Sequence, residues 1–299
     1  MNNKIAAVVV TYNRLELLKK CLQSIKSQTH KVDEIIVVNN SSTDGTEEWL
    51  NSQKDLTVIT QENSGSAGGQ YTGIKYAYEK GYDWIWSIDT DIILFENALE
   101  ILLVHSKIKN VGFLSSNIFY SNEELAHANI PELGKPYEIL SAIAFNKPIP
   151  ILAASFGSLL VRREVIRKVG LPCKEFFIWG DDSEFTLRIT LNGFQGYLVM
   201  ESKAYHFNEE NSPNPYSKIN VSDKKFLYGV RNMIYVSIQR NIITHSSKFR
   251  GYLSALGFIY RVYASKRQSN INNIYLAFIL IKLYWKGIFF KPKIELLNE

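Results

Sequence analysis

The sequence predicts an α/β fold built on a doubly wound, mostly parallel sheet, because strand-like and helix-like segments alternate along its first part. Two observations carry this prediction. Residues 5–10 form a continuous apolar run, Ile-Ala-Ala-Val-Val-Val, which is typical of a strand buried on both faces. Directly after it, Leu15, Leu18, Leu22 and Ile25 recur at helical spacing. In a sheet of this type ligands bind beyond the carboxyl ends of the strands, so polar clusters at strand ends mark the candidate site.

The alternation continues beyond this first strand and helix. The pattern predicts, in order, a strand over residues 35–38, a helix starting near 44–47, a strand over 56–60, a helix from a glycine-rich turn at 64–69 through residue 78, and a strand over 84–88. Residues 115–150 lack a clear period and contain four prolines, which predicts a long loop or a small excursion over the site. From about residue 216 the pattern is helical and basic, so we divide the chain into residues 1–215 and a helical annex of residues 216–299.

The composition favours a folded chain with a sizeable core, since 46% of the 299 residues are hydrophobic. Cys21 and Cys173 are the two cysteines, and their wide separation fits neither a disulfide framework nor a cysteine-rich metal cluster. The first twelve residues run straight into an apolar strand and show no secretion-signal pattern. We therefore expect a cytoplasmic protein.

Basic residues are concentrated in the annex. Residues 215–299 hold 14 Lys and Arg against three Asp and Glu. The most apolar late stretch, residues 274–290, is interrupted by Lys282 and Lys286, so it is too short to span a bilayer and is typical of an amphipathic helix. Such a tail suits a membrane surface, a lipid-pyrophosphate acceptor or nucleic acid, and the alternative is a solvated helix face. No nucleic-acid motif accompanies the charge, so we favour peripheral contact with the inner face of the cell membrane over nucleic acid.

Three polar segments lie where the first strands end. The first strand ends in Thr11-Tyr12-Asn13-Arg14, and the second in the run Asn-Asn-Ser-Ser-Thr-Asp-Gly at residues 39–45. A dinucleotide-binding domain would carry G-x-G-x-x-G after the first strand, and its absence argues against a dehydrogenase. Residues 63–69, Asn-Ser-Gly-Ser-Ala-Gly-Gly, permit close backbone approach to a ligand. Each segment has a plainer interpretation as a polar turn or a helix cap.

An acidic pair follows the strand at residues 84–88 directly. Asp89-Thr90-Asp91 places two carboxylates one residue apart at a strand end. This arrangement suits Mg²⁺ or Mn²⁺, which take oxygen ligands and share them with phosphate oxygens. Helix capping is the alternative, but the position beyond a buried strand favours a cation site.

A second acidic cluster lies at residues 179–185, Trp-Gly-Asp-Asp-Ser-Glu-Phe. Asp182 is our first candidate for a general base and Asp181 the second, whereas the structural alternative is a pair of acids at a helix start. His206 stands between aromatic residues further on. It is either a core histidine or a partner of Asp91 in a mixed carboxylate and imidazole site that suits Mn²⁺.

The order of these segments resembles the family 2 glycosyltransferases of the GT-A fold, and within them the rhamnosyltransferase and galactofuranosyltransferase group. The resemblance covers about two thirds of the chain. It rests on several motifs: residues 9–14 (VVTYNR), 36–46 (IVVNNSSTDGT), 63–69, Asp89-Thr90-Asp91, residues 157–163 (GSLLVRR), residues 177–185 (FIWGDDSEF) with Arg188, and His206. Residues 228–232 (YGVRN) resemble a tail motif of the same group.

This resemblance implies an inverting transfer of a sugar from a UDP- or dTDP-sugar, with Mn²⁺ or Mg²⁺, to a growing glycan or lipid-linked oligosaccharide. Asp182 would be the base, and Asp89, Asp91 and His206 would hold the metal, with Asp89 also serving the ribose. The residues implied in donor binding are Thr11, Tyr12, Asn13, Arg14, Asn39, Asn40, Asn63, Gly65, Gly68 and Trp179, with Arg188 ordering the acidic cluster.

Two positions depart from the pattern of the group. Asn39 stands where relatives commonly have Asp, although its amide can still accept a hydrogen bond from a nucleobase. The metal motif is Asp-Thr-Asp where galactofuranosyl-transferring relatives tend to have three acids. A non-catalytic nucleotide-sugar or glycan-binding protein of the same fold is the alternative function.

Overall fold

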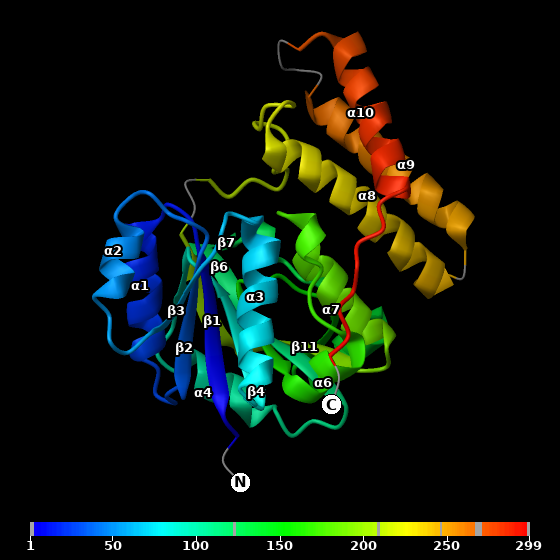
Figure 1. Cartoon of the computed structure of the whole chain (residues 1–299). Coiled ribbons are helices and arrows are strands. Elements are labelled where there is room, and N and C mark those ends of the chain that lie inside the picture. The colour runs from blue at the N-terminus through cyan, green and yellow to red at the C-terminus, as the bar shows by residue number, and fades with distance from the viewer. Residues whose placement is uncertain (1–2, 122–123, 208–209, 246, 267–270, 298–299) are drawn as a thin grey trace.

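The computed structural model describes residues 3–121, 124–207, 210–245, 247–266 and 271–297 (Figure 1). Its strands are β1 (Ile5–Thr11), β2 (Glu34–Asn39), β3 (Thr57–Thr60), β4 (Trp84–Asp89), β5 (Ile92–Leu94), β6 (Val111–Ser121), β7 (Glu124–Leu125), β8 (Glu132–Leu133), β9 (Ile149–Ala153), β10 (Ser158–Arg162) and β11 (Gln195–His206). Its α-helices are α1 (Leu15–Lys26), α2 (Thr46–Asn51), α3 (Gly65–Glu79), α4 (Ala98–Val104), α5 (Pro136–Ala144), α6 (Arg163–Val169), α7 (Asp181–Leu191), α8 (Lys224–His245), α9 (Lys248–Lys266) and α10 (Asn273–Ile288). Two short 3₁₀ turns are η1 (His127–Asn129) and η2 (Lys174–Phe176).

The strands form one mixed sheet with the order β3-β2-β1-β4-β10-β6-β11-β9-β8, to which β5 and β7 are attached. The first four strands along the chain are mutually parallel, as predicted, and β10 runs antiparallel to both of its neighbours. In the register, Thr11 pairs with Asn39 and Val10 with Asp89. The polar ends of β1, β2 and β4 therefore meet at one edge of the sheet.

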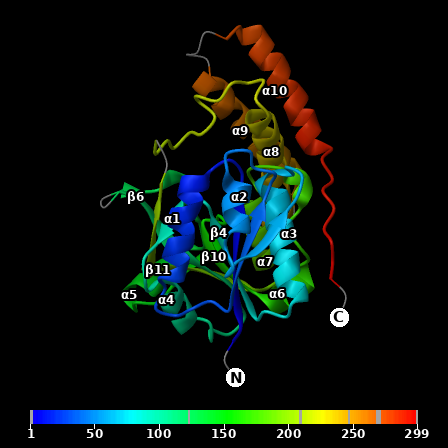
Figure 2. The same cartoon turned by 60° about the vertical axis from the view of Figure 1, so that its left-hand side comes forward.

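Helices cover both faces of the sheet (Figure 2). Along β1 the side chains alternate, so that Ile5, Ala7 and Val9 pack against α1 and α4, whereas Ala6 and Val8 face the side of α3, α6 and α7. β1 is therefore buried on both faces, which explains its continuous apolar run.

The glycine-rich segment differs from the prediction. We expected a turn over residues 64–69 followed by a helix, but α3 already begins at Gly65. Gly69 and Gly73 lie on the face of α3 that packs on β1, where an added Cβ would come within 2.3 Å of Val10 and Val8 respectively. These glycines let the helix lie close to the sheet, and this tertiary contact outweighs their low helix propensity.

The region 115–150 is also more regular than expected. β6 continues to Ser121, and the excursion that follows contains β7, η1, β8 and α5. The polar start of this region does not interrupt β6, because Ser116 bonds to Ser158 and Ser202, at 2.7 Å each, inside the sheet. Buried hydroxyl groups that satisfy one another can occupy a buried strand.

The annex consists of α8, α9 and α10, which pack around their own apolar core. After α10 the chain returns to the lower part of the sheet domain (Figure 1). There Leu171 donates its backbone N–H to the carbonyl of Glu295 (3.0 Å), and the Glu295 carboxylate pairs with Lys75 Nζ (2.7 Å) and accepts from the Tyr71 hydroxyl. The annex is thus joined to the rest of the molecule by two segments, the one before α8 and residues 289–297.

Candidate active site

The polar strand ends are tied together by their own hydrogen bonds. Asn13, with a left-handed backbone (φ 51°), accepts from the Thr43 N–H at 2.7 Å and donates its N–H to Ser42 Oγ at 3.0 Å. Asn40 Nδ2 donates to the Gly65 carbonyl (3.0 Å), and Asn63 Oδ1 accepts from the Gly65 N–H (3.0 Å). Asn13, Asn40 and Asn63 therefore hold the loops of the predicted donor site in place.

Two other atoms at this edge lack an internal partner. Thr11 Oγ1 and Asn39 Nδ2 are buried, sit on paired residues of β1 and β2, and have no hydrogen-bond partner within the described part of the chain. Asn39 Oδ1 is already occupied by the Ser42 N–H at 3.0 Å. Buried polar atoms of this kind are satisfied in most proteins, so they are available to a bound group. Tyr12, beside them, is about half exposed.

The acidic residues after β4 meet His206 at the end of β11. Asp91 Oδ2 accepts from Arg14 Nη1 at 2.5 Å, and Asp91 Oδ1 lies 3.4 Å from His206 Nε2. The Asp91 carbonyl also accepts from the Phe207 N–H at 2.8 Å. The predicted association of Asp91 with His206 is therefore present, and Arg14 adds a cationic group to it.

The orientation of the His206 ring depends on a residue that the sequence did not mark. His206 Nδ1 lies 2.6 Å from Asn129 Oδ1, and Asn129 Nδ2 donates to Ser155 Oγ at 2.8 Å. Because the amide nitrogen is used elsewhere, its oxygen faces the ring and accepts from Nδ1. His206 Nε2 is then the nitrogen directed at Asp91. Asn129 belongs to the excursion after β6, where no local pattern indicated a functional residue.

The second acidic cluster begins α7, after a strained turn. Phe177, Trp179 and Gly180 all have positive φ angles (64°, 63° and 85°). Asp181 is buried at the first position of α7, and Asp182 Oδ1 accepts from the Ser183 N–H (2.6 Å) and Oγ (3.3 Å). The helix start that we gave as the structural alternative is thus real, and within the part of the chain that the structure describes Asp182 Oδ2 has no hydrogen bond of its own.

The turn before α7 is held by the annex. Asn232 of α8 donates from Nδ2 to the carbonyl oxygens of Phe176 (2.9 Å), Ile178 (2.9 Å) and Trp179 (2.8 Å). Asn232 Oδ1 in turn accepts from Arg231 Nε (2.9 Å) and Nη2 (2.6 Å). Asn232 is fully buried, and it lies within the tail motif noted in the sequence, for which we had inferred no role.

Electrostatic coupling places the two acidic clusters in one neighbourhood. Burial raises the pKa of Asp89 to about 7, and the negative charges of Asp91 and Asp182 add to this rise. Burial also raises the pKa of Asp182, against the hydrogen bonds from Ser183. Burial opposes ionisation of Asp91 as well, but hydrogen bonding and charge from His206 and Arg14 outweigh it and lower its pKa.

The pKa of Lys225, in the first turn of α8, also depends on charges of this cluster. Burial lowers its pKa, and so does the positive charge of Arg14, while Asp91 acts in the opposite direction. The annex thus contributes a cationic side chain to the surroundings of the site.

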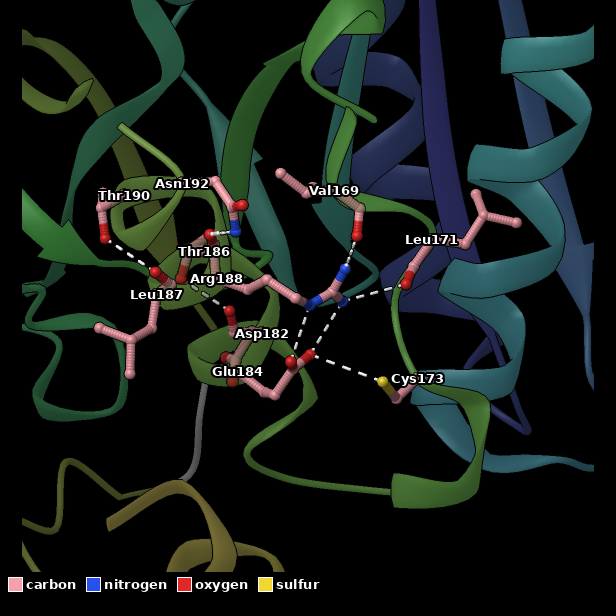
Figure 3. A network of polar contacts seen from close by, with 10 residues as sticks. All are labelled: Val169, Leu171, Cys173, Asp182, Glu184, Thr186, Leu187, Arg188, Thr190 and Asn192. Carbon is pink, nitrogen blue, oxygen red and sulfur yellow. Dashed lines mark hydrogen bonds and ion pairs between the residues drawn. The ribbon is translucent and has the colours of Figure 1, made fainter. Parts of the chain in front are cut away.

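Arg188, which the resemblance implied in ordering the acidic cluster, has partners on α7 and on the segment before η2. Arg188 forms a two-pronged ion pair with Glu184 and donates to the carbonyls of Val169 and Leu171, so it fixes the chain segment before η2 to α7 (Figure 3). It bonds to neither Asp181 nor Asp182 within the described residues. We therefore assign Arg188 a positioning role rather than contact with the donor.

Gly65 and Gly68 are explained by packing. An added Cβ at Gly65, which has a φ of +75°, would lie 1.9 Å from the Phe177 carbonyl oxygen, and at Gly68 it would lie 2.1 Å from Ser64 Oγ. At these two positions the missing side chain makes room for the protein's own atoms, and contact of this segment with the donor stays a prediction. Trp179 packs against Tyr216 of the annex, with ring centroids 5.3 Å apart.

The residues present fit a divalent cation in part. Within the described ranges, no group of three or more His, Cys, Asp or Glu side chains is close enough to hold a metal ion. Asp91 and His206 fit as two ligands, because 3.4 Å between their atoms is near the ~3 Å that separates neighbouring ligands of an octahedral ion of this size. Asp89 does not complete a set of three here.

A family model described as "Glycosyl transferase family 2" matches residues 6–170, which is more than half of the chain. The chain belongs to glycosyl transferase family 2. It is therefore a glycosyltransferase, and the resemblance found in the sequence is confirmed.

Individual relatives within this family fall in the expected group. The chain is 28% identical over 199 residues to galactofuranosyltransferase GlfT1 of Mycolicibacterium smegmatis, covering 63% of this chain and 66% of that protein. It is 25% identical over 209 residues to dTDP-rhamnosyl transferase RfbF of Shigella flexneri, covering 69% of this chain and 70% of that protein. The first of these matches spans just under two thirds of the relative.

Two solved structures of the GT-A fold superpose on nearly the full length of this chain. A GalNAc-T7 structure with UDP, GalNAc and Mn²⁺ superposes with a TM-score of 0.62 at 14% identity, covering 96% of this chain and 56% of that one. Staphylococcus aureus TarS (residues 1–349) with UDP-GlcNAc gives 0.61 at 15% identity, covering 95% and 80%. At these identities the likeness shows the fold alone, and it confirms the predicted GT-A architecture with C-terminal helices.

Proposed function

We propose that this glycosyltransferase moves a sugar of the rhamnose or galactofuranose type, with inversion, from a UDP- or dTDP-sugar. The acceptor is a growing cell-surface glycan or a lipid-linked oligosaccharide. The names of the two relatives support the choice of sugar. In this proposal residues 1–215 form the catalytic domain, and residues 216–299 form the helical annex.

The donor binds where the ends of β1, β2 and β4 converge. Thr11 Oγ1 and Asn39 Nδ2 offer unpaired polar atoms to the nucleoside, and Tyr12 lies exposed beside them. Mn²⁺ or Mg²⁺ would be held by Asp91 and His206, with Asp89 nearby, and when bound it offsets the negative charge on the departing diphosphate. The guanidinium of Arg14, already on Asp91, adds positive charge at the same place.

Asp182 acts as the general base. Its Oδ1 is held by Ser183, so Oδ2 is the atom that takes the proton from the acceptor hydroxyl as that oxygen attacks the anomeric carbon. Burial raises the pKa of Asp182, which makes the carboxylate a better base at neutral pH. Attack from the side opposite the diphosphate inverts the configuration of the sugar.

The observation that carries this proposal is the meeting of three segments at Asp91. Asp91 Oδ2 accepts from Arg14 Nη1 at 2.5 Å and Asp91 Oδ1 lies 3.4 Å from His206 Nε2, so the ends of β1, β4 and β11 converge on one carboxylate. The pKa of Asp89, raised by burial and further by the charges of Asp91 and of Asp182 on α7, supports the same grouping.

The test is a screen of UDP- and dTDP-sugars, galactofuranose and rhamnose donors included, for Mn²⁺-dependent nucleotide release with and without an acceptor glycan. We expect one donor class to be consumed, with loss of the reaction in EDTA and in Asp91→Ala. Turnover that is unchanged by EDTA and by Asp91→Ala would contradict the proposed cation site.

A further inference from the structure

The outer helix of the annex, α10, is apolar on two opposite sides. Leu276, Leu280 and Leu283 face α8 and α9 and are buried in the annex core. On the opposite side a second set of apolar side chains repeats at spacings of three and four, and each is between 54% and 81% exposed: Ile274, Phe278, Ile281, Trp285 and Phe289. A helix on the surface of a globular protein normally has a polar outer face. We call this second set the α10 stripe.

The stripe is continuous and has a charged border. Phe278, Ile281, Trp285 and Phe289 line one open hollow together with Lys282 and Lys286. At 100° per residue, both lysines fall on the same flank of the stripe, and both are exposed. This is the pattern of a helix that lies in a membrane interface, with apolar and aromatic side chains on one face and lysines that reach toward headgroups.

We propose that the α10 stripe inserts into the outer part of an anionic lipid bilayer, with α10 parallel to the surface and Lys282 and Lys286 at the level of the phosphates. The sequence suggested membrane contact for the basic tail as a whole, with residues 274–290 as an amphipathic helix. The stripe assigns that contact to one helix face and makes apolar insertion, rather than charge attraction only, part of the binding.

The charge of the annex decides between possible occupants of this face. A second copy of the chain would bring together two annexes that each have a large basic excess, and their charges would repel. Nucleic acid would match the lysines but not five exposed apolar side chains. An anionic bilayer satisfies both.

The architecture is consistent with contact at the surface rather than insertion across it. No helix of the described residues is long and apolar enough to cross a membrane. α8 lies between α10 and the sheet domain, so the stripe faces away from the catalytic part of the molecule (Figures 1 and 2).

The test is flotation of the full chain with vesicles of phosphatidylcholine alone and of phosphatidylcholine with phosphatidylglycerol. We expect binding to the anionic vesicles. Phe278→Ser with Trp285→Ser should weaken it by about tenfold or more, and Lys282→Gln with Lys286→Gln by on the order of tenfold. The matched control is Tyr137→Ser with Phe145→Ser, in α5 and directly after it. These side chains are at least as exposed as Phe278 and Trp285, and α5 lies far from α10 (Figure 2), so this variant should bind as the wild type does.

A second measurement reports insertion directly. Vesicles that contain brominated acyl chains should quench the fluorescence of Trp285, and Trp285→Phe should remove that part of the quenching while binding is largely kept. All substituted side chains are exposed, so circular dichroism and the melting temperature should stay unchanged.

Three outcomes would overturn the proposal: no flotation of the wild type with anionic vesicles, flotation of the α10 variants equal to the wild type, or flotation without quenching. A change from dimer to monomer on Phe278→Ser with Trp285→Ser, with flotation unchanged, would instead assign the stripe to a second copy. Donor turnover can be measured without vesicles, so it tests the proposed reaction independently of membrane binding. Failure of the membrane proposal and failure of the proposed reaction are therefore distinguishable.

Discussion

Asn232 provides the sharpest test of how the annex supports catalysis. One side-chain amide bonds to three carbonyl oxygens of the strained turn that precedes Asp181 and Asp182. Asn232→Ala removes these bonds and also the oxygen that accepts from Arg231. We expect the turn to loosen and the proposed base to lose its fixed position.

The magnitude follows from the geometry. Two amide hydrogens are shared among three carbonyl groups, and a buried polar group that loses its partner costs about 1–3 kcal/mol. We therefore estimate that the turn is destabilised by about 2–4 kcal/mol, which corresponds to roughly 30- to 1000-fold in the population of the ordered turn. If that order is needed for proton transfer, kcat should fall by a similar factor while the KM for the donor changes little.

Two measurements check this prediction. Amide hydrogen exchange should speed up at the Ile178 N–H and at the Ala67 N–H, which bonds to the Phe177 carbonyl (3.2 Å). Turnover of the donor found by the screen gives kcat and KM. Asn232→Asp keeps an acceptor for Arg231 but cannot donate to carbonyls, so it should behave as Asn232→Ala does.

The control is Asn241→Ala on the same helix, since Asn241 Nδ2 donates to the Ser237 carbonyl of α8 (2.9 Å) and, among the described residues, to no group of the sheet domain. This variant should keep wild-type exchange and turnover. Our reasoning would be refuted if Asn232→Ala left both the exchange of the turn and kcat at wild-type values, or if Asn232→Asp retained full activity.

Three further predictions concern the acidic clusters and the histidine. Asp182→Asn should nearly abolish transfer and leave nucleotide affinity largely intact, and an equal loss of affinity in calorimetry would argue against its role as base. Asn129→Ala should weaken Mn²⁺ binding by about 10- to 100-fold, because the ring of His206 loses the bond that orients it; unchanged affinity in a Mn²⁺ titration would exclude this. Burial, with the charge of Asp182, raises the pKa of Asp181 well above its usual value. Between the usual pKa and the raised one, the folded protein holds a proton that the unfolded chain releases, so the stability of the fold decreases as pH rises through this interval. In EDTA, urea unfolding from about pH 5 to about pH 8 should show Asp181→Asn gaining on the wild type as pH rises, and a constant difference between them would contradict this.

The first half of the fold could be predicted because its signals are local. The apolar run of β1 and the spacing of Leu18 and Leu22 in α1 need no distant partner to be recognised. The glycines of α3 led us to predict a turn instead of a helix start. They are needed because α3 packs closely on Val8 and Val10 of β1, a contact that the local sequence does not reveal. β6 was obscured by polar residues that are satisfied by strands far along the chain.

The candidate site divides in the same way. Asp91 and His206 could be expected to meet, because a strand-end rule and a family resemblance both pointed to them. Asn129 could not, because its role exists only where the excursion after β6 folds back on His206. Arg188 was expected to order the acidic cluster, and it pairs with Glu184 of that cluster. Its bonds to the carbonyls of Val169 and Leu171 could not be expected, because backbone acceptors leave no trace in a sequence motif.

The return of residues 289–297 to the sheet domain has a practical consequence for experiments. The described chain begins at residue 3 and ends at residue 297, and both points lie at the end of the molecule opposite the annex (Figure 1). If the protein is immobilised on a solid support through a tag at either terminus, α10 should therefore point away from that support. Truncation after α10 would do more than shorten the chain, because it would uncover the α3 surface at Lys75 and leave the Leu171 N–H without the carbonyl of Glu295.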